Sequence, residues 1–170
     1  PLSIGTAVSI RVGYYLGQNK ADISVLITTL GLTISFILAI MTATITVLFR
    51  TEIAYLYTDN HEVVTLAGSL MFLAALYQLS DSIQVVAAGA LRGYKDTRSA
   101  LYITLFSYWG VGMLLGYVLA RTDAIVPAMG AHGFWMGLIA GLTSAAILFA
   151  FRLRYIQNRG LFTEVIASSH

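Results

Sequence analysis

The stretch VVTLAGSLMFLAALYQLSDSIQVVAAGAL, from Val63 to Leu91, is an apolar run that Tyr77-Gln-Leu-Ser-Asp81-Ser-Ile-Gln84 interrupts. About 20 helical residues, each rising ~1.5 Å, cross the hydrocarbon core of a bilayer. The run is therefore long enough to span a membrane, and we expect a transmembrane helix that carries a polar segment inside it.

Asp81 is the residue in this run that most needs an explanation. An ionisable side chain deep in a membrane span costs at least ~2.5–3.5 kcal/mol on insertion scales. Tyr77 precedes Asp81 by four residues and Gln84 follows it by three, so all three share one face of a helix. A carboxylate flanked by neutral oxygens suits a hard cation such as sodium. The alternatives are a protonated carboxyl bonded to a neighbouring helix and, for Tyr77, a packing role.

The composition excludes an ordinary soluble domain. The chain has 170 residues, of which 58% are hydrophobic and only 11% charged, whereas soluble domains run near 25% charged. The formal net charge of +2 is too small to indicate nucleic-acid binding. There are no cysteines, so neither a disulfide framework nor a cysteine metal site is expected. We predict an all-α, polytopic membrane protein.

Four complete spans are expected, at about 21–49, 63–91, 100–120 and 133–151, within a transmembrane bundle covering residues 1–154. Residues 155–170 are expected to form a C-terminal tail. Alternate loops then fall on opposite sides of the membrane. One side collects most of the basic residues, namely Lys20, Arg92, Lys95, Arg98, Arg152, Arg154 and Arg159, and the other holds only Arg50 and Arg121. Because basic loops stay in the cytoplasm, this predicts a cytoplasmic C-terminus.

The first residues read as the second half of a helix. Pro1 to Gly17 is largely apolar and lacks both the basic leader and the cleavage site of a signal peptide. We therefore expect the chain to be a C-terminal piece of a larger protein.

The common catalytic motifs are missing from the sequence. No phosphate-binding glycine loop ending in Lys-Ser or Lys-Thr, no His-Glu-x-x-His and no Gly-x-Ser-x-Gly is present. Asp81 is the one acidic residue deep in a span, so a two-carboxylate site lacks its second member. We predict that the protein is not an enzyme, has no catalytic residues and needs no cofactor.

Three stretches resemble a known transporter family. Gln84-Val-Val-Ala-Ala-Gly-Ala-Leu-Arg92-Gly93-Tyr-Lys-Asp96-Thr97 is similar to the signature of multidrug and toxic compound extrusion (MATE) transporters. Ser3-Ile-Gly-Thr-Ala-Val-Ser-Ile-Arg11-Val-Gly13 resembles a stretch late in the eighth helix of that family, and Phe134-Trp135-Met-Gly137 resembles its last helix. The resemblance covers nearly the whole chain and is closest to the bacterial NorM-type branch.

The resemblance implies a twelve-helix antiporter made of two bundles, of which this chain is the end of helix eight through helix twelve. Such transporters sit in the bacterial inner membrane and exchange sodium ions or protons for cationic or amphipathic drugs. In the family, an acidic residue of the tenth helix and a tyrosine one turn before it contribute to the cation site. These match Asp81 and Tyr77, whereas Gln84 rests on helical spacing alone as a candidate cavity-lining residue. The family's seventh-helix glutamate and its N-terminal bundle have no counterpart here.

Two other functions fit the composition. A lipid-linked oligosaccharide flippase of the wider superfamily needs basic residues in its cavity to hold phosphate, yet no lysine or arginine lies deep in any complete span. A non-transporting membrane subunit would use its glycine-rich faces only for assembly. The exporter remains our leading prediction.

Overall fold

The computed structural model describes residues 1–121 and 131–159, and this part of the chain contains helices but no strand. The helices are α1 (Leu2–Gly17), α2 (Ala21–Leu48), the short α3 (Arg50–Tyr55), α4 (His61–Gly93), α5 (Thr97–Leu105), η1 (Phe106–Met113), α6 (Leu114–Arg121) and α7 (Ala131–Arg159). The segment η1 is a π-helix that continues directly from α5 into α6. These three elements therefore act as one rod, Thr97–Arg121.

Four of the described helices are long and apolar enough to cross a membrane: Ala21–Leu48, His61–Gly93, Thr97–Arg121 and Ala131–Asn158. The predicted all-α membrane bundle is confirmed. The last helix is longer than the sequence predicts, because it continues past residue 151 to Arg159 and so takes in the start of the expected tail. Buried Leu153 and Ile156 extend its packed face and account for the added turns. Residues 160–170 lie outside the described part.

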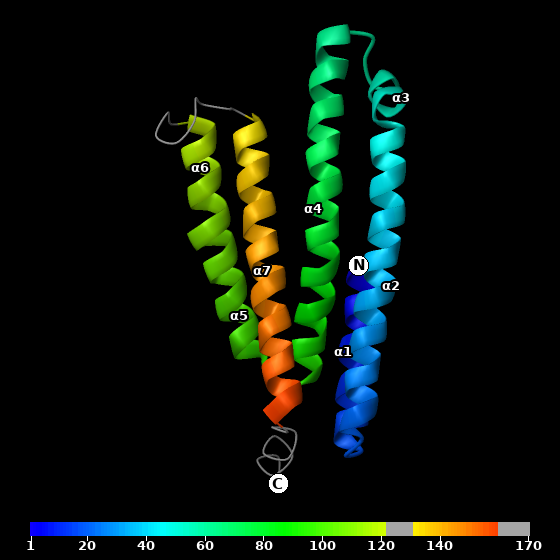
Figure 1. Cartoon of the computed structure of the whole chain (residues 1–170), viewed down its shortest axis with the longest axis vertical. Helices are drawn as coiled ribbons and strands as arrows, with labels where there is room; N and C mark the ends of the chain where they lie inside the picture. The colour runs from blue at the N-terminus through cyan, green and yellow to red at the C-terminus, as the bar shows by residue number, and fades with distance from the viewer. Residues whose placement is uncertain (122–130, 160–170) are drawn as a thin grey trace.

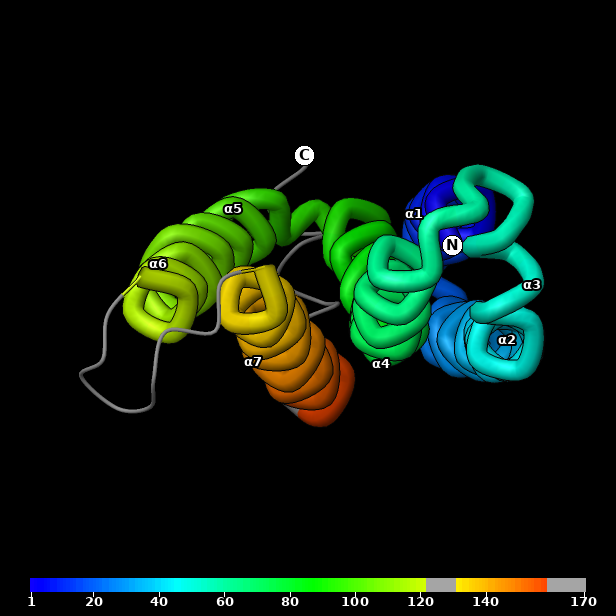
Figure 2. The backbone as a smooth tube through the Cα atoms, turned by 90° about the horizontal axis from the view of Figure 1, so that it is seen from above, coloured from blue at the N-terminus to red at the C-terminus, as the bar shows by residue number. Residues whose placement is uncertain are grey.

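Helix α4 stands at the centre of the bundle. It has α1 and α2 on one side and α7 on the other, with the α5–η1–α6 rod packed against α7 (Figures 1 and 2). The α1–α2 turn, the α4–α5 turn and the end of α7 lie at the lower end of Figure 1, whereas α3 and the end of α6 lie at the upper end. The structure therefore gathers Lys20 and the Arg92–Arg98 segment at one end and places Arg50 and Arg121 at the other.

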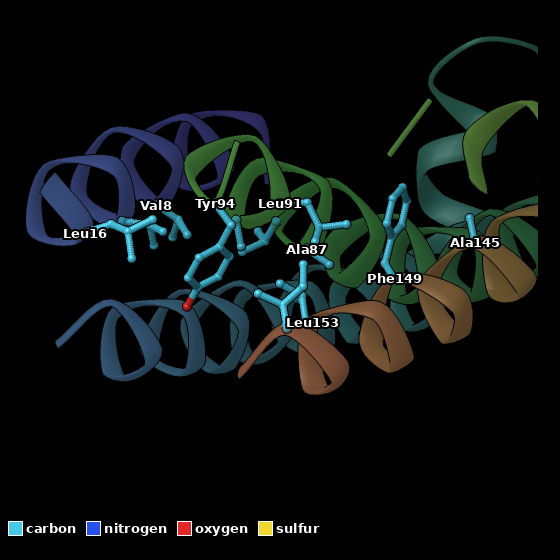
Figure 3. Close-up of a cluster of buried hydrophobic side chains, with 12 residues drawn as sticks. Val8, Leu16, Ala87, Leu91, Tyr94, Ala145, Phe149 and Leu153 are labelled. Carbon is cyan, nitrogen blue, oxygen red and sulfur yellow. The ribbon is translucent and has the colours of Figure 1, made fainter. Parts of the chain in front are cut away.

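The apolar core lies in the lower half, where α4 meets α1 and α7. Leu91 and Phe149 are fully buried there, and the Tyr94 ring closes the cluster toward α2 (Figure 3). The cluster consists of Val8, Val12, Leu16, Val86, Ala87, Ala90, Leu91, Tyr94, Ala145, Phe149, Leu153 and Ile156. Many large apolar side chains of α2 are instead exposed, as expected for a helix that faces lipid.

Glycines let neighbouring helices approach to backbone contact. A Cβ atom added at Gly137 of α7 would clash with the backbone of Gly116 in α6, and one added at Gly89 of α4 would clash with the backbone of Gly5 in α1. Small residues allow such contacts in membranes, where helix packing replaces the hydrophobic effect as a driving force. The position of α7 beside the rod therefore depends on the absence of side chains at these glycines.

We predict that Gly137→Ala in the whole protein lowers stability by roughly 1–3 kcal/mol, the usual cost of overpacking. Thermal unfolding of the purified protein in detergent measures the effect. Gly17→Ala is the matched control, because nothing lies within 4 Å of a Cβ at that position. Equal stability of the two variants would contradict the packing described here.

An ion pair closes the lower end of the bundle. Asp96, in the α4–α5 turn, accepts a 2.6 Å hydrogen bond from Nε of Arg152 in α7. Burial raises the pKa of Asp96, but the Arg152 guanidinium and the Ser99 hydroxyl outweigh burial, so the pKa lies below its ordinary value. The pair therefore stays ionised at neutral pH and holds the turn against α7.

We predict that Asp96→Asn lowers the stability of the whole protein by about 1 kcal/mol, a value kept small because Arg152 is partly exposed. A depressed pKa stabilises the fold above the ordinary pKa of aspartate, and this stability disappears as the pH falls through the lowered value. The stability difference between Asp96→Asn and the wild-type protein should therefore still be present at pH 5, as measured by thermal unfolding. Two results would contradict a stabilising Asp96–Arg152 ion pair. One is loss of the stability difference at pH 5, and the other is an equal loss of stability in Asp22→Asn, a substitution at an exposed site.

Candidate functional site

Asp81 lies in the interior of α4, 20 residues after His61 and 12 residues before Gly93, the two ends of the membrane span. Its side chain and that of Tyr77 are half-buried, and Gln84 is only 6% exposed. Among the described residues, the Asp81 carboxylate makes no hydrogen bond and no ion pair. The α4 helix therefore carries a membrane-embedded acid that has no cationic partner in this part of the chain.

Tyr77 faces α7 and the rod. Its ring meets that of Trp135 edge to face, with centroids 5.9 Å apart and planes at 81°. It also lines a cavity of about 240 Å³ between α4, η1 and α7, together with Tyr108, Gly112, Leu138, Gly141 and Leu142. Asp81 and Gln84 do not line this cavity, since they lie one and two turns further along α4.

Tyr108 of η1 connects the three predicted residues. Its hydroxyl lies within electrostatic range of Asp81 and Tyr77, and the Gln84 side chain lies close enough to act on it by hydrogen bonding. Tyr77 and Asp81 also act on each other. The predicted face of α4 is thus completed by a second phenol from a different helix, which spacing within α4 alone could not predict.

Two buried oxygens near this face lack partners. Gln84 Oε1 and Ser107 Oγ make no hydrogen bond within the described residues, and Ser107 is fully buried. Buried polar atoms are nearly always paired with protein or ordered water, so each unpaired one needs an explanation. Ser107 lies in the π-helix η1, and such insertions often occur at functional sites. Gln84 Oε1 is therefore an unpaired acceptor one turn from Asp81 on α4.

The neighbouring polar residues of α4 serve helix packing. The Gln78 amide donates to the Thr42 hydroxyl of α2 at 2.8 Å, and Ser80 and Thr143 of α7 share a 2.9 Å hydrogen bond. Each is therefore bonded to a neighbouring helix and not to Asp81. His132, at the start of α7, is 2.8 Å from the Ser69 hydroxyl and so ties α7 to α4.

The described residues contain no group of three or more His, Cys, Asp or Glu side chains that could hold a metal ion. A cation at this face would therefore have one carboxylate, that of Asp81, and otherwise neutral oxygens from Tyr77, Tyr108 and Gln84. That donor set suits an alkali cation or a proton better than a transition metal.

Comparison with known proteins finds relatives that match nearly the whole chain. It is 70% identical over 166 residues to the "Probable multidrug resistance protein NorM" of Shewanella oneidensis, covering 98% of this chain and 36% of that protein. It is 54% identical over 157 residues to the "Multidrug resistance protein NorM" of Photobacterium profundum, covering 92% and 34%. The chain thus spans about a third of the length of these curated relatives.

A solved structure has the same fold. The crystal structure of the eukaryotic MATE transporter AtDTX14 superposes with a TM-score of 0.83 at 25% identity, covering 97% of this chain and 37% of that one. The sequence model of the MatE family matches residues 1–118. The resemblance seen in the sequence is confirmed, and the chain belongs to the MatE family.

Proposed function

We propose that the whole protein is a secondary active multidrug exporter that antiports sodium ions or protons against cationic or amphipathic drugs. The observation that carries the proposal is Asp81, a carboxylate inside a membrane-spanning helix that forms no ion pair with any described side chain. Such a group can be neutralised by a proton, a small cation or a cationic substrate. The names of the relatives support the same cargo class.

The mechanism we infer is competition at one carboxylate. Cation and drug would favour opposite states of two bundles that rock about a central cavity, since a ligand shifts an equilibrium only by binding one state better. Asp81 would hold the cation, with Tyr77 and Tyr108 as neighbouring oxygens. The second bundle would come from the remainder of the protein, because this chain spans only about a third of its relatives.

The surroundings of the site favour a cationic cargo over a phosphate. No lysine or arginine occurs between residues 21–49, 63–91, 100–120 or 133–151. A lipid-linked oligosaccharide carries phosphate groups that would need such residues. By the count of basic residues at the two ends, we place the protein in the bacterial inner membrane with the end holding Lys20 and Arg152 in the cytoplasm.

We predict that Asp81→Asn in the whole protein abolishes ion-coupled efflux but leaves membrane insertion intact, because asparagine keeps the shape and loses the charge. Ethidium export from cells and the amount of protein in the membrane fraction give the two readouts. Asp22→Asn, at the exposed start of α2, is the control and should export normally. Unchanged export by the Asp81 variant would remove Asp81 from the mechanism.

We further predict that Gln84→Leu raises the cation concentration needed for half-maximal efflux by about tenfold, the effect of losing one hydrogen-bonding group on a charge. Replacing an unpaired buried oxygen by an apolar group should leave folding unharmed. Gln78→Leu, which loses only the bond to Thr42, should not change the cation dependence. If both variants show the wild-type dependence, Gln84 has only a packing role.

A further inference from the structure

A second cavity lies at the opposite end of the bundle from the Asp96–Arg152 pair. It has a volume of about 340 Å³ and lies between α3 and the first turns of α4. Its lining residues are Arg50, Thr51, Tyr55, His61, Val64, Thr65, Gly68 and Ser69. Thr65 and Asp81 are sixteen residues apart on α4, which at ~100° per residue places them on nearly opposite faces. This cavity is therefore separate from the proposed cation site.

The α3 wall of the cavity offers uncommitted hydrogen-bond donors. Within the described part of the chain, Arg50 forms no ion pair, and the hydroxyls of Thr51 and Tyr55 form no hydrogen bond. An arginine presents five N–H donors in a planar fork that matches the oxygens of a phosphate. Two neutral hydroxyls beside a guanidinium form a donor set suited to an anion.

The α4 wall is held in place by its own bonds. The Thr65 hydroxyl donates to the His61 carbonyl at 2.9 Å, and the Ser69 hydroxyl lies 2.7 Å from the Leu66 carbonyl and 2.8 Å from His132 of α7. The His61 ring, 3.5 Å from the Thr65 hydroxyl, can present its other nitrogen to a ligand. The α4 side of the cavity is thus held by hydrogen bonds, whereas the α3 side carries hydrogen-bond donors without a partner among the described residues.

The residues that flank the cavity belong at the membrane–water boundary. Phe49, Leu56 and Tyr57, on either side of α3, are exposed by 53%, 83% and 85%. Aromatic and apolar side chains at the end of a membrane span settle among lipid head groups. The nearby carboxylates of Glu52 and Glu62 are exposed and do not line the cavity. We therefore expect Arg50 to lie at the depth of the lipid phosphates.

We propose that this cavity binds the phosphate of an anionic phospholipid head group, with Arg50 as its main ligand and Thr51, Tyr55 and His61 as supporting donors. The acyl chains would run down the membrane beside the exposed apolar side chains. A cationic drug is excluded, because no acidic residue lines the cavity. The bound lipid would strengthen the existing contact between α3 and α4.

The test uses the purified, delipidated whole protein in neutral detergent. Native mass spectrometry and thermal unfolding are measured after addition of phosphatidylglycerol, phosphatidylcholine or inorganic phosphate. We expect phosphatidylglycerol to bind and raise the unfolding temperature, and Arg50→Gln to weaken this binding about tenfold, as expected for loss of a charge-assisted pair. Tyr55→Phe should weaken it less.

Arg121→Gln is the matched control, because Arg121 is an exposed arginine at the same end of the bundle, outside the cavity. Equal loss of lipid binding in the two arginine variants would show a general charge effect and overturn the site. Equal stabilisation by inorganic phosphate would assign the cavity to a soluble anion and overturn the lipid assignment. Equal binding of phosphatidylcholine and phosphatidylglycerol would overturn the selectivity for anionic lipid.

Discussion

A charged group inside a membrane-spanning helix is the constraint on which the rest of this structure depends. At least ~2.5–3.5 kcal/mol opposes keeping Asp81 there, and no side chain among the described residues forms an ion pair with it. Helix α4 lies at the centre of the bundle with helices on both sides, and the phenols of Tyr77, on the same helix, and Tyr108, on η1, interact electrostatically with Asp81. An acid kept at this cost is best explained by an ion or substrate that neutralises it.

Close helix packing places the second phenol. Gly137 and Gly141 of α7 admit the backbone of the rod at Gly116 and Gly112, and this contact sets the position of η1 beside α4 and α7. The π-helix then alters the direction of the side chains that follow α5, so that Tyr108 joins the cavity and Ser107 is buried. Packing and site are therefore coupled, because a change at the glycines would also move the oxygens around Asp81.

Helical spacing predicted the all-α bundle and the shared face of Tyr77, Asp81 and Gln84. Helical spacing could not predict which residues of different helices contact one another. Gly13 and Gly17 have the spacing of a packing motif, yet Gly17 contacts nothing and Gly5 makes the close approach to Gly89. The π-helix has no signature in the sequence, so the burial of Ser107 and the role of Tyr108 appear only in three dimensions.

Flux driven by an imposed gradient tests the central claim most directly. The whole protein, reconstituted into liposomes loaded with a cationic dye, is given an inward sodium gradient, an inward proton gradient or neither. We predict dye release that depends on at least one gradient and stops when both are dissipated. Release that proceeds equally without any gradient, or no release under any condition, would contradict a cation-coupled exporter built around Asp81.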